Sequence, residues 1–153
     1  MLVARLISLA AATMLVCQPA HSQQFDSRLR GNWTLDIAQS SFGPDGPPVA
    51  GTVRWSEHGW VVALVFGNGY VYADAVITDS GCRLIGVSSD YSCTFLVLAP
   101  KHVRFTLKQR GITRRVGDIT LVDANTTRTV HRVTPASDTP YTETTIWIRD
   151  PRK

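Results

Sequence analysis

The stretch of sequence that decides the fold is residues 60–77, WVVALVFGNGYVYADAVI. β-Branched and aromatic residues fill both of its halves, and these residue types favour strands. Between the halves lies Gly67-Asn68-Gly69, and glycine and asparagine tolerate the positive φ angles that tight hairpins require. The stretch therefore predicts two antiparallel strands, Trp60–Phe66 and Tyr70–Ile77, joined by a tight turn.

The same pattern extends outward in both directions. No long run places apolar residues at helical spacing, whereas residues 102–109 alternate cleanly, with Val103, Phe105 and Leu107 on one face. Further predicted strands are Leu29–Ile37, Thr52–Glu57, Cys82–Val87, Tyr91–Leu98, His102–Gln109, Ile112–Val116, Asp118–Val122, Thr126–Val133 and Tyr141–Arg149. The chain is therefore predicted to be all-β, an up-and-down antiparallel β-barrel of roughly eight to ten short strands, with a two-sheet β-sandwich as the alternative.

One predicted strand is apolar on both of its faces. Val61–Val65 contains no polar residue, although the outer face of a small barrel ordinarily meets solvent. Either a loop or a second subunit covers this strand, or the barrel exposes an apolar patch. We therefore treat a homodimer as a hypothesis.

Residues 1–22 differ from the rest of the chain. Arg5 is their only charged side chain; the apolar run Leu6–Val16 follows, and Ala20-His21-Ser22 places small residues at a cleavage site. The run is too short to span a bilayer, which predicts a cleavable signal peptide followed by a single domain, residues 23–153. The lipoprotein alternative, through Cys17, is less favoured because Val16 is a poor residue before a lipid-modified cysteine. With no further membrane span expected, the protein is predicted to be exported, to a periplasm or to the medium.

Removal of the signal peptide leaves an even pair of cysteines, Cys82 and Cys93. In an exported protein such a pair predicts a disulfide. Two buried thiols are the alternative, and a metal site is disfavoured because no histidine lies close in sequence.

Sequence signals for catalysis are missing. There is no Gly-x-Ser-x-Gly turn, and His58, His102 and His131 are isolated from one another in sequence. Convergence of His102 and His131 on neighbouring strands stays open as a possibility. We therefore predict no enzyme activity, no catalytic residues, no metal and no cofactor.

The full chain holds 16 Lys and Arg against 12 Asp and Glu, a net charge of +4. The excess of basic side chains is concentrated in the predicted strands between residues 102 and 133. The predicted basic face consists of Arg104, Lys108, Arg114, Arg128 and Arg132. Such a face suits a polyanion or a protein partner. A solvated face that discourages aggregation is the simpler interpretation, and no nucleic acid is expected as a partner.

At Gly31-Asn32-Trp33 the chain resembles the opening strand of lipocalin-like, calycin-type β-barrels. The longer stretch from Gly31 to Phe42, followed by Pro44 and Pro47, is similar to a group of mostly uncharacterised exported bacterial proteins. The resemblance implies that Trp33 closes one end of the barrel. It also implies that an arginine of the last strand packs across this tryptophan, and Arg149 is the candidate.

Aromatic residues suggest where such a barrel would bind a ligand. Trp55, Trp60, Tyr72 and Phe105 are predicted to line the lumen, the first three near the Gly/Pro-rich loop at residues 40–48. Ordinary core packing is the alternative explanation. The leading hypothesis is a non-enzymatic barrel that binds a small apolar or amphipathic molecule, and the competing one is a solid barrel that docks partners through its Arg-rich strands.

Overall fold

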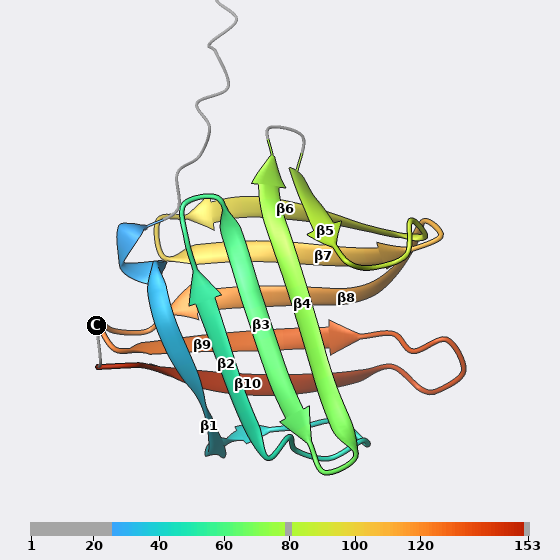
Figure 1. The fold of residues 1–153 in the computed structure, drawn as a ribbon, viewed down its shortest axis with the longest axis horizontal. Coiled ribbons are helices and arrows are strands. Elements are labelled where there is room, and N and C mark those ends of the chain that lie inside the picture. Colours follow the sequence, from blue (N-terminus) through green and yellow to red (C-terminus); the bar gives the residue numbers. More distant parts are fainter. Residues whose placement is uncertain (1–25, 79–80, 152–153) are drawn as a thin grey trace, which may run out of the picture.

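The computed structural model describes residues 26–78 and 81–151. The predicted signal peptide lies outside the described residues. The described chain forms one closed antiparallel barrel (Figure 1). Its strands are β1 (Gly31–Ser41), β2 (Ala50–Trp55), β3 (Gly59–Phe66), β4 (Gly69–Thr78), β5 (Gly81–Ile85), β6 (Tyr91–Ala99), β7 (His102–Gln109), β8 (Ile112–Leu121), β9 (Thr126–Val133) and β10 (Tyr141–Arg149). A short 3-10 turn, η1 (Ser27–Leu29), precedes them.

The predicted all-β, up-and-down barrel is confirmed, and the sandwich alternative is excluded. Each strand pairs with the next one in sequence, and β10 returns to pair with β1. The hairpin predicted from residues 60–77 is β3–β4, with Phe66 opposite Gly69. In one place two predicted strands are a single strand, since β8 continues through Gly117. A side chain at this position would overlap the Phe105 ring, which lies across it from β7.

Because the strands form a meander, successive turns lie at alternate ends of the barrel, and η1 covers one of these ends (Figure 1). Leu29 and Trp33 are fully buried there, and the indole Nε1 of Trp33 donates to the Leu29 carbonyl at 3.0 Å. The Arg149 guanidinium lies 4.2 Å from the centre of the Trp33 ring. Such a contact contributes about 0.5–2 kcal/mol. The two residues that the resemblance implied for closure are thus in contact at this closed end.

Arg149 also links three segments of the closed end. Its guanidinium and Nε donate to the carbonyls of Arg28, of Arg30 at 2.9 Å and of Ala124 at 2.9 Å. These carbonyls belong to η1, to the residue between η1 and β1, and to the β8–β9 turn. A planar group with five donors suits this arrangement better than a lysine ammonium does. Arg149 therefore fixes the first and last strands to one another.

The predicted Cys82–Cys93 disulfide is confirmed, and it lies where the barrel wall has the fewest ladder bonds. β5 pairs with β6 at the single pair Cys82↔Cys93, whose Cα atoms are 5.3 Å apart. By contrast, β10 pairs with β9 continuously from Tyr141 to Ile148. The disulfide therefore links the least paired seam of the wall.

The outer surface over β3 and β4 is partly apolar, as the composition of β3 indicated. Val65, Tyr70 and Tyr72 are 45%, 80% and 54% exposed. No described loop covers them, so the apolar patch is exposed in this chain, and the homodimer stays a prediction. None of the described helical turns is long and apolar enough to cross a bilayer.

Candidate functional site

The barrel contains a cavity of about 470 Å³, within the usual size range for small-molecule sites. Inward-pointing side chains form its wall, for example Val62 and Leu64 of β3 and Leu107 of β7. At the end opposite η1, its rim includes residues of the β1–β2 loop such as Phe42 and Pro48. The lumen is therefore hollow, with one closed end and one loop-bordered mouth.

The floor of the cavity is aromatic. Trp55 and Trp60 stack with ring centres 5.3 Å apart, and Phe105 lies 5.9 Å from Trp60. All three residues line the cavity, as the sequence predicted. Trp55 and Trp60 flank the β2–β3 turn, however, which belongs to the closed end. Their predicted place beside the Gly/Pro-rich loop was wrong, because that loop borders the mouth.

Tyr72 is a correction to the predicted lumen set. Its neighbours in β4, Val71 and Ala73, line the cavity, while Tyr72 is 54% exposed on the outside. Adjacent residues of a strand point to opposite faces, so the inward position of Ala73 forces Tyr72 outward. The prediction placed β4 in the wrong phase because large apolar or aromatic residues occupy both of its faces.

On the side of the lumen opposite β2 and β3, the strands β8, β9 and β10 place polar side chains in the cavity. Arg115 Nη1 lies 2.8 Å from Glu143 Oε1, and the Glu143 side chain is 12% exposed. His131 Nε2 lies 3.5 Å from Thr145 Oγ1, which also accepts from Trp147 Nε1 at 2.9 Å. We call six of the cavity-lining polar residues of these strands the polar wall: Arg115, Thr127, Thr129, His131, Glu143 and Thr145.

His131 is electrically neutral at physiological pH. Burial, followed by the positive charge of Arg115, lowers the pKa of His131 to about 3. The Phe105 ring meets the imidazole edge-on, with centres 5.8 Å apart. The Nδ1 atom of His131 is buried and has no hydrogen-bond partner among the described residues. The imidazole is thus a neutral polar group held within the barrel with unused hydrogen-bonding capacity.

Sequence reasoning missed the polar wall. It treated His131 as isolated in sequence, and it named neither Arg115 nor Glu143 as a candidate site residue. The usable signal was alternation in β9, where Arg128 and Arg132 take the outer face and so turn Thr129 and His131 inward. His102 does not converge with His131 but lies near Asp118 on the outer surface, at 3.5 Å.

At the mouth, the β1–β2 loop packs against the last strand. A side chain in place of Gly43 would overlap the ring of Tyr141, so the loop backbone contacts this ring directly. Both residues line the cavity, as do Asp45 and Gly46 of the same loop. The loop therefore narrows the entrance on the side of β10.

The predicted basic face is partly neutralised. Asp118 accepts from Arg104 Nε at 2.6 Å and from Arg132 Nη2 at 2.7 Å. The hydrogen bond from Arg104, helped by Arg132, lowers the pKa of Asp118 to about 2. Arg114 donates to the Pro135 carbonyl at 3.2 Å, while Arg128 is exposed. Lys108 completes the face on β7.

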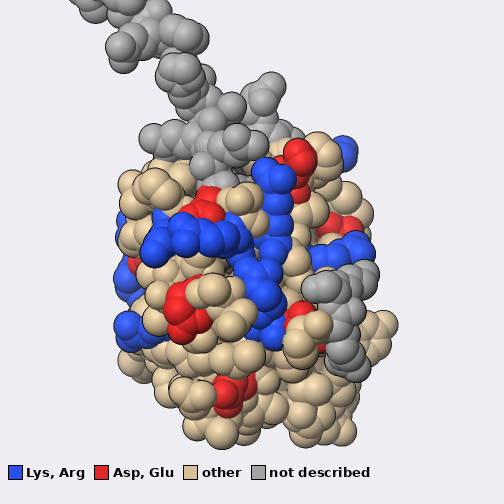
Figure 2. Space-filling view, turned by 90° about the vertical axis from the view of Figure 1, so that its left-hand side faces the viewer, with Lys and Arg blue, Asp and Glu red and all other residues tan. Residues whose placement is uncertain are grey.

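A second concentration of Lys and Arg lies at the closed end. Figure 2 shows it on the face around η1 and the end of β10, with acidic side chains in between. Arg28 pairs with Asp26 at 2.5 Å, and Arg30 with Glu57 at 3.5 Å. Arg28 and Arg30 of this face therefore each have an acidic partner.

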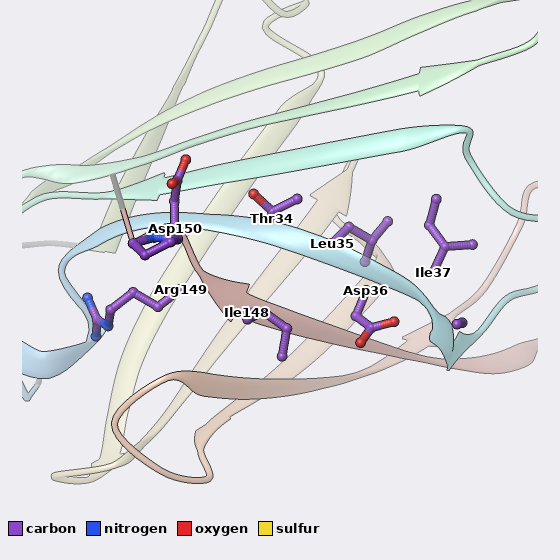
Figure 3. A pocket seen from close by; sticks show the side chains of 9 residues that line it. Thr34, Leu35, Asp36, Ile37, Ile148, Arg149 and Asp150 are labelled. Atoms are coloured by element: carbon purple, nitrogen blue, oxygen red, sulfur yellow. The ribbon is translucent and has the colours of Figure 1, made fainter. Parts of the chain in front are cut away.

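A further hollow, of about 560 Å³, lies on the outer surface between β1 and β10 (Figure 3). Residues 34–38 and 148–151 line it. Asp36, which lines it, already accepts from the backbone N–H and the side-chain amide of Gln39. This groove therefore offers few free polar groups, and the lumen is the stronger candidate site.

The described residues include no cluster of three or more His, Cys, Asp or Glu side chains that could hold a metal ion. Comparison of the chain with protein families, with curated proteins and with solved structures gives no match. The geometry of the lumen is therefore the main indication of function.

Proposed function

We propose that this protein is an exported, non-enzymatic, lipocalin-like barrel that binds a small apolar or amphipathic molecule in its lumen. The observation that carries the proposal is the cavity of about 470 Å³, whose floor is formed by Trp55, Trp60 and Phe105. Aromatic and aliphatic walls with a few placed polar groups are the usual construction of small-molecule sites. Burial of apolar ligand surface would supply most of the affinity.

The kinship with lipocalin-like barrels is supported by architecture and by the contact of Arg149 with Trp33. Lipocalins have eight strands, whereas this barrel has the ten strands β1–β10. Barrel diameter grows with strand number, which is consistent with a hollow rather than a filled interior. Export is supported by the leader-like residues 1–22 and by the disulfide.

The test is a fluorescence titration with N-phenyl-1-naphthylamine, an uncharged apolar probe. Two variants receive the same substitution on opposite faces of β3: Val62→Phe reduces the cavity volume, and Val61→Phe alters the outer surface. We expect the wild type and Val61→Phe to bind the probe, and Val62→Phe to bind it at least about tenfold more weakly.

A wild type that does not bind the probe, or equal effects of the two variants, would contradict a lumen site. Circular dichroism and melting curves establish that each variant is folded. Native mass spectrometry of protein purified from its own periplasm or medium adds an independent readout, because a retained ligand appears as a fixed added mass that is lost on denaturation.

The alternative is docking of a polyanion or protein through the Arg-rich strands β7–β9. Its support is weaker because Asp118 already holds both Arg104 and Arg132. Salt distinguishes the two functions. Polyanion binding falls steeply as the salt concentration rises, whereas binding of an uncharged molecule in the lumen is nearly unaffected.

A further inference from the structure

The two sides of the lumen differ in chemistry, and the difference bears on the class of ligand. β2 and β3 contribute Val53, Trp55, Trp60, Val62 and Leu64, all apolar. The polar wall on β8, β9 and β10 faces them across the cavity. A ligand that satisfies both sides has an apolar body and a polar group at one side.

The charges of the polar wall cancel. Arg115 is the only Lys or Arg among the described residues that line the cavity, and Glu143 pairs with it at 2.8 Å. An ionised carboxylate placed beside Arg115 would also meet the carboxylate of Glu143. Transfer of an unpaired charge out of water is strongly unfavourable. A carboxylate in this lumen would therefore lack a free counter-charge.

The uncharged groups of the polar wall, by contrast, have unused hydrogen-bonding capacity. Thr127 and Thr129 line the cavity, and their hydroxyls make no hydrogen bond to another described residue. Thr145 Oγ1 accepts from Trp147, so its own proton is available to His131 Nε2. In the tautomer in which Thr145 donates this bond, the imidazole proton lies on Nδ1.

Nδ1 of His131 is buried without a partner in the described part of the chain. An unsatisfied buried donor is unfavourable, so in this tautomer a ligand oxygen that accepts from Nδ1 gains an advantage. Together with the free threonine hydroxyls, this donor suits an alcohol, ketone, ester or amide.

We infer that the lumen selects an uncharged amphipathic molecule whose hydrogen-bonding oxygen lies against the polar wall, and that it disfavours ionised fatty acids. The inference rests on the proposed function, since it names the ligand class of the same cavity. The ligand oxygen meets Thr129 and His131, while the apolar body packs on Trp60 and Phe105.

The test is competition against bound N-phenyl-1-naphthylamine at pH 8 with three molecules of similar chain length: 1-decanol, 2-undecanone and decanoate. We expect the alcohol and the ketone to displace the probe at concentrations at least about tenfold lower than decanoate. Failure of the probe itself to bind would overturn the proposed function. A bound probe that decanoate displaces as well as decanol does would overturn this inference alone.

Charge variants give a second test. Glu143→Gln releases Arg115 from its partner, and we expect decanoate to gain about five- to tenfold relative to decanol. The matched control is Asp118→Asn, which removes a carboxylate from arginines on the outer surface and should leave the preference unchanged. An unchanged preference in Glu143→Gln would contradict the charge argument.

A hydroxyl variant tests the polar contact without altering charge. Thr129→Val keeps the shape of the side chain, and we expect it to weaken decanol binding about three- to tenfold without altering probe affinity. Thr142→Val on β10, at an exposed position, is the matched control. Equal decanol affinity in wild type and Thr129→Val would remove this residue from the site, and a parallel loss of probe affinity would indicate a structural role only.

Discussion

Trp33 and Trp60 both lie inside the barrel, but their surroundings differ. Trp33 is 1% exposed, its N–H has an acceptor, and Arg149 covers its ring. Trp60 is 9% exposed, and its ring borders the cavity of about 470 Å³. At the closed end the indole N–H of Trp33 has an acceptor, whereas in the lumen Nδ1 of His131 has no partner among the described residues. Contacts at the closed end therefore stabilise the fold, and those in the lumen are available to a ligand.

The largest expected effect separates these two regions directly. Trp33→Ala removes a fully packed ring and should lower the free energy of unfolding by about 3–5 kcal/mol. Trp60→Ala removes a ring that has packing on only part of its surface, so a smaller loss of about 2 kcal/mol is expected. Urea denaturation followed by circular dichroism measures both values.

The same two variants should reverse their order in binding. Trp60→Ala is expected to weaken the naphthylamine probe about tenfold, and Trp33→Ala, measured where it is folded, should leave affinity nearly unchanged. Equal losses of stability, or equal losses of affinity, would show that stability and binding are not divided between the closed end and the lumen.

The disulfide provides an intermediate effect. The double variant Cys82→Ser with Cys93→Ser should lose about 2–3 kcal/mol of stability, because the closed loop between them is short. Cys93 lines the cavity, but serine has a similar volume, so probe affinity should change little. Denaturation of the reduced wild type is the control and should match the variant. A stability equal to that of the oxidised wild type would mean that the β5–β6 seam does not need this link.

The smallest expected effect comes from Asp118 on the outer surface. Its folded-state pKa of about 2 lies below the ordinary value of 3.8, so its contribution is complete above about pH 4 and is lost as the pH falls toward 2. Arg104 and Arg132 are 40% and 52% exposed, and solvent screening reduces the contribution to about 1 kcal/mol.

Asp118→Asn should therefore be less stable than the wild type at pH 7, and the difference should vanish near pH 2. Denaturation at a series of pH values measures this difference. Asp90→Asn removes the partner of Arg110, whose side chain is 77% exposed, and serves as the control with little expected change. A constant difference between Asp118→Asn and wild type across the pH range would contradict the ion-pair explanation.

Most of the fold was predictable because strand signals are local. The Gly67-Asn68-Gly69 turn, the alternation of β7 and the even pair of cysteines each carry their own physical reason. The continuity of β8 through Gly117 was not predictable, because it depends on the Phe105 ring of a neighbouring strand.

The candidate site was predicted in part. Trp55, Trp60 and Phe105 line the cavity, since large aromatic residues favour the interior face of a strand. The prediction that Tyr72 points into the lumen was wrong because β4 is apolar or aromatic on both faces. The sequence therefore does not determine which face of β4 points inward. The pairing of Arg115 with Glu143 joins β8 to β10 across β9, and no spacing within one strand signals such a contact.

The pairing of β1 with β10 has a consequence for the order of events during synthesis. Every other pair of adjacent strands in the barrel is also consecutive in sequence, so those hairpins can form as the chain emerges. Trp33 is made early, whereas Arg149, opposite it in the ladder, comes from the last strand. Until β10 is complete, β1 and β9 present open edges that other chains could join. Truncation before β10 should therefore yield aggregates rather than a smaller barrel.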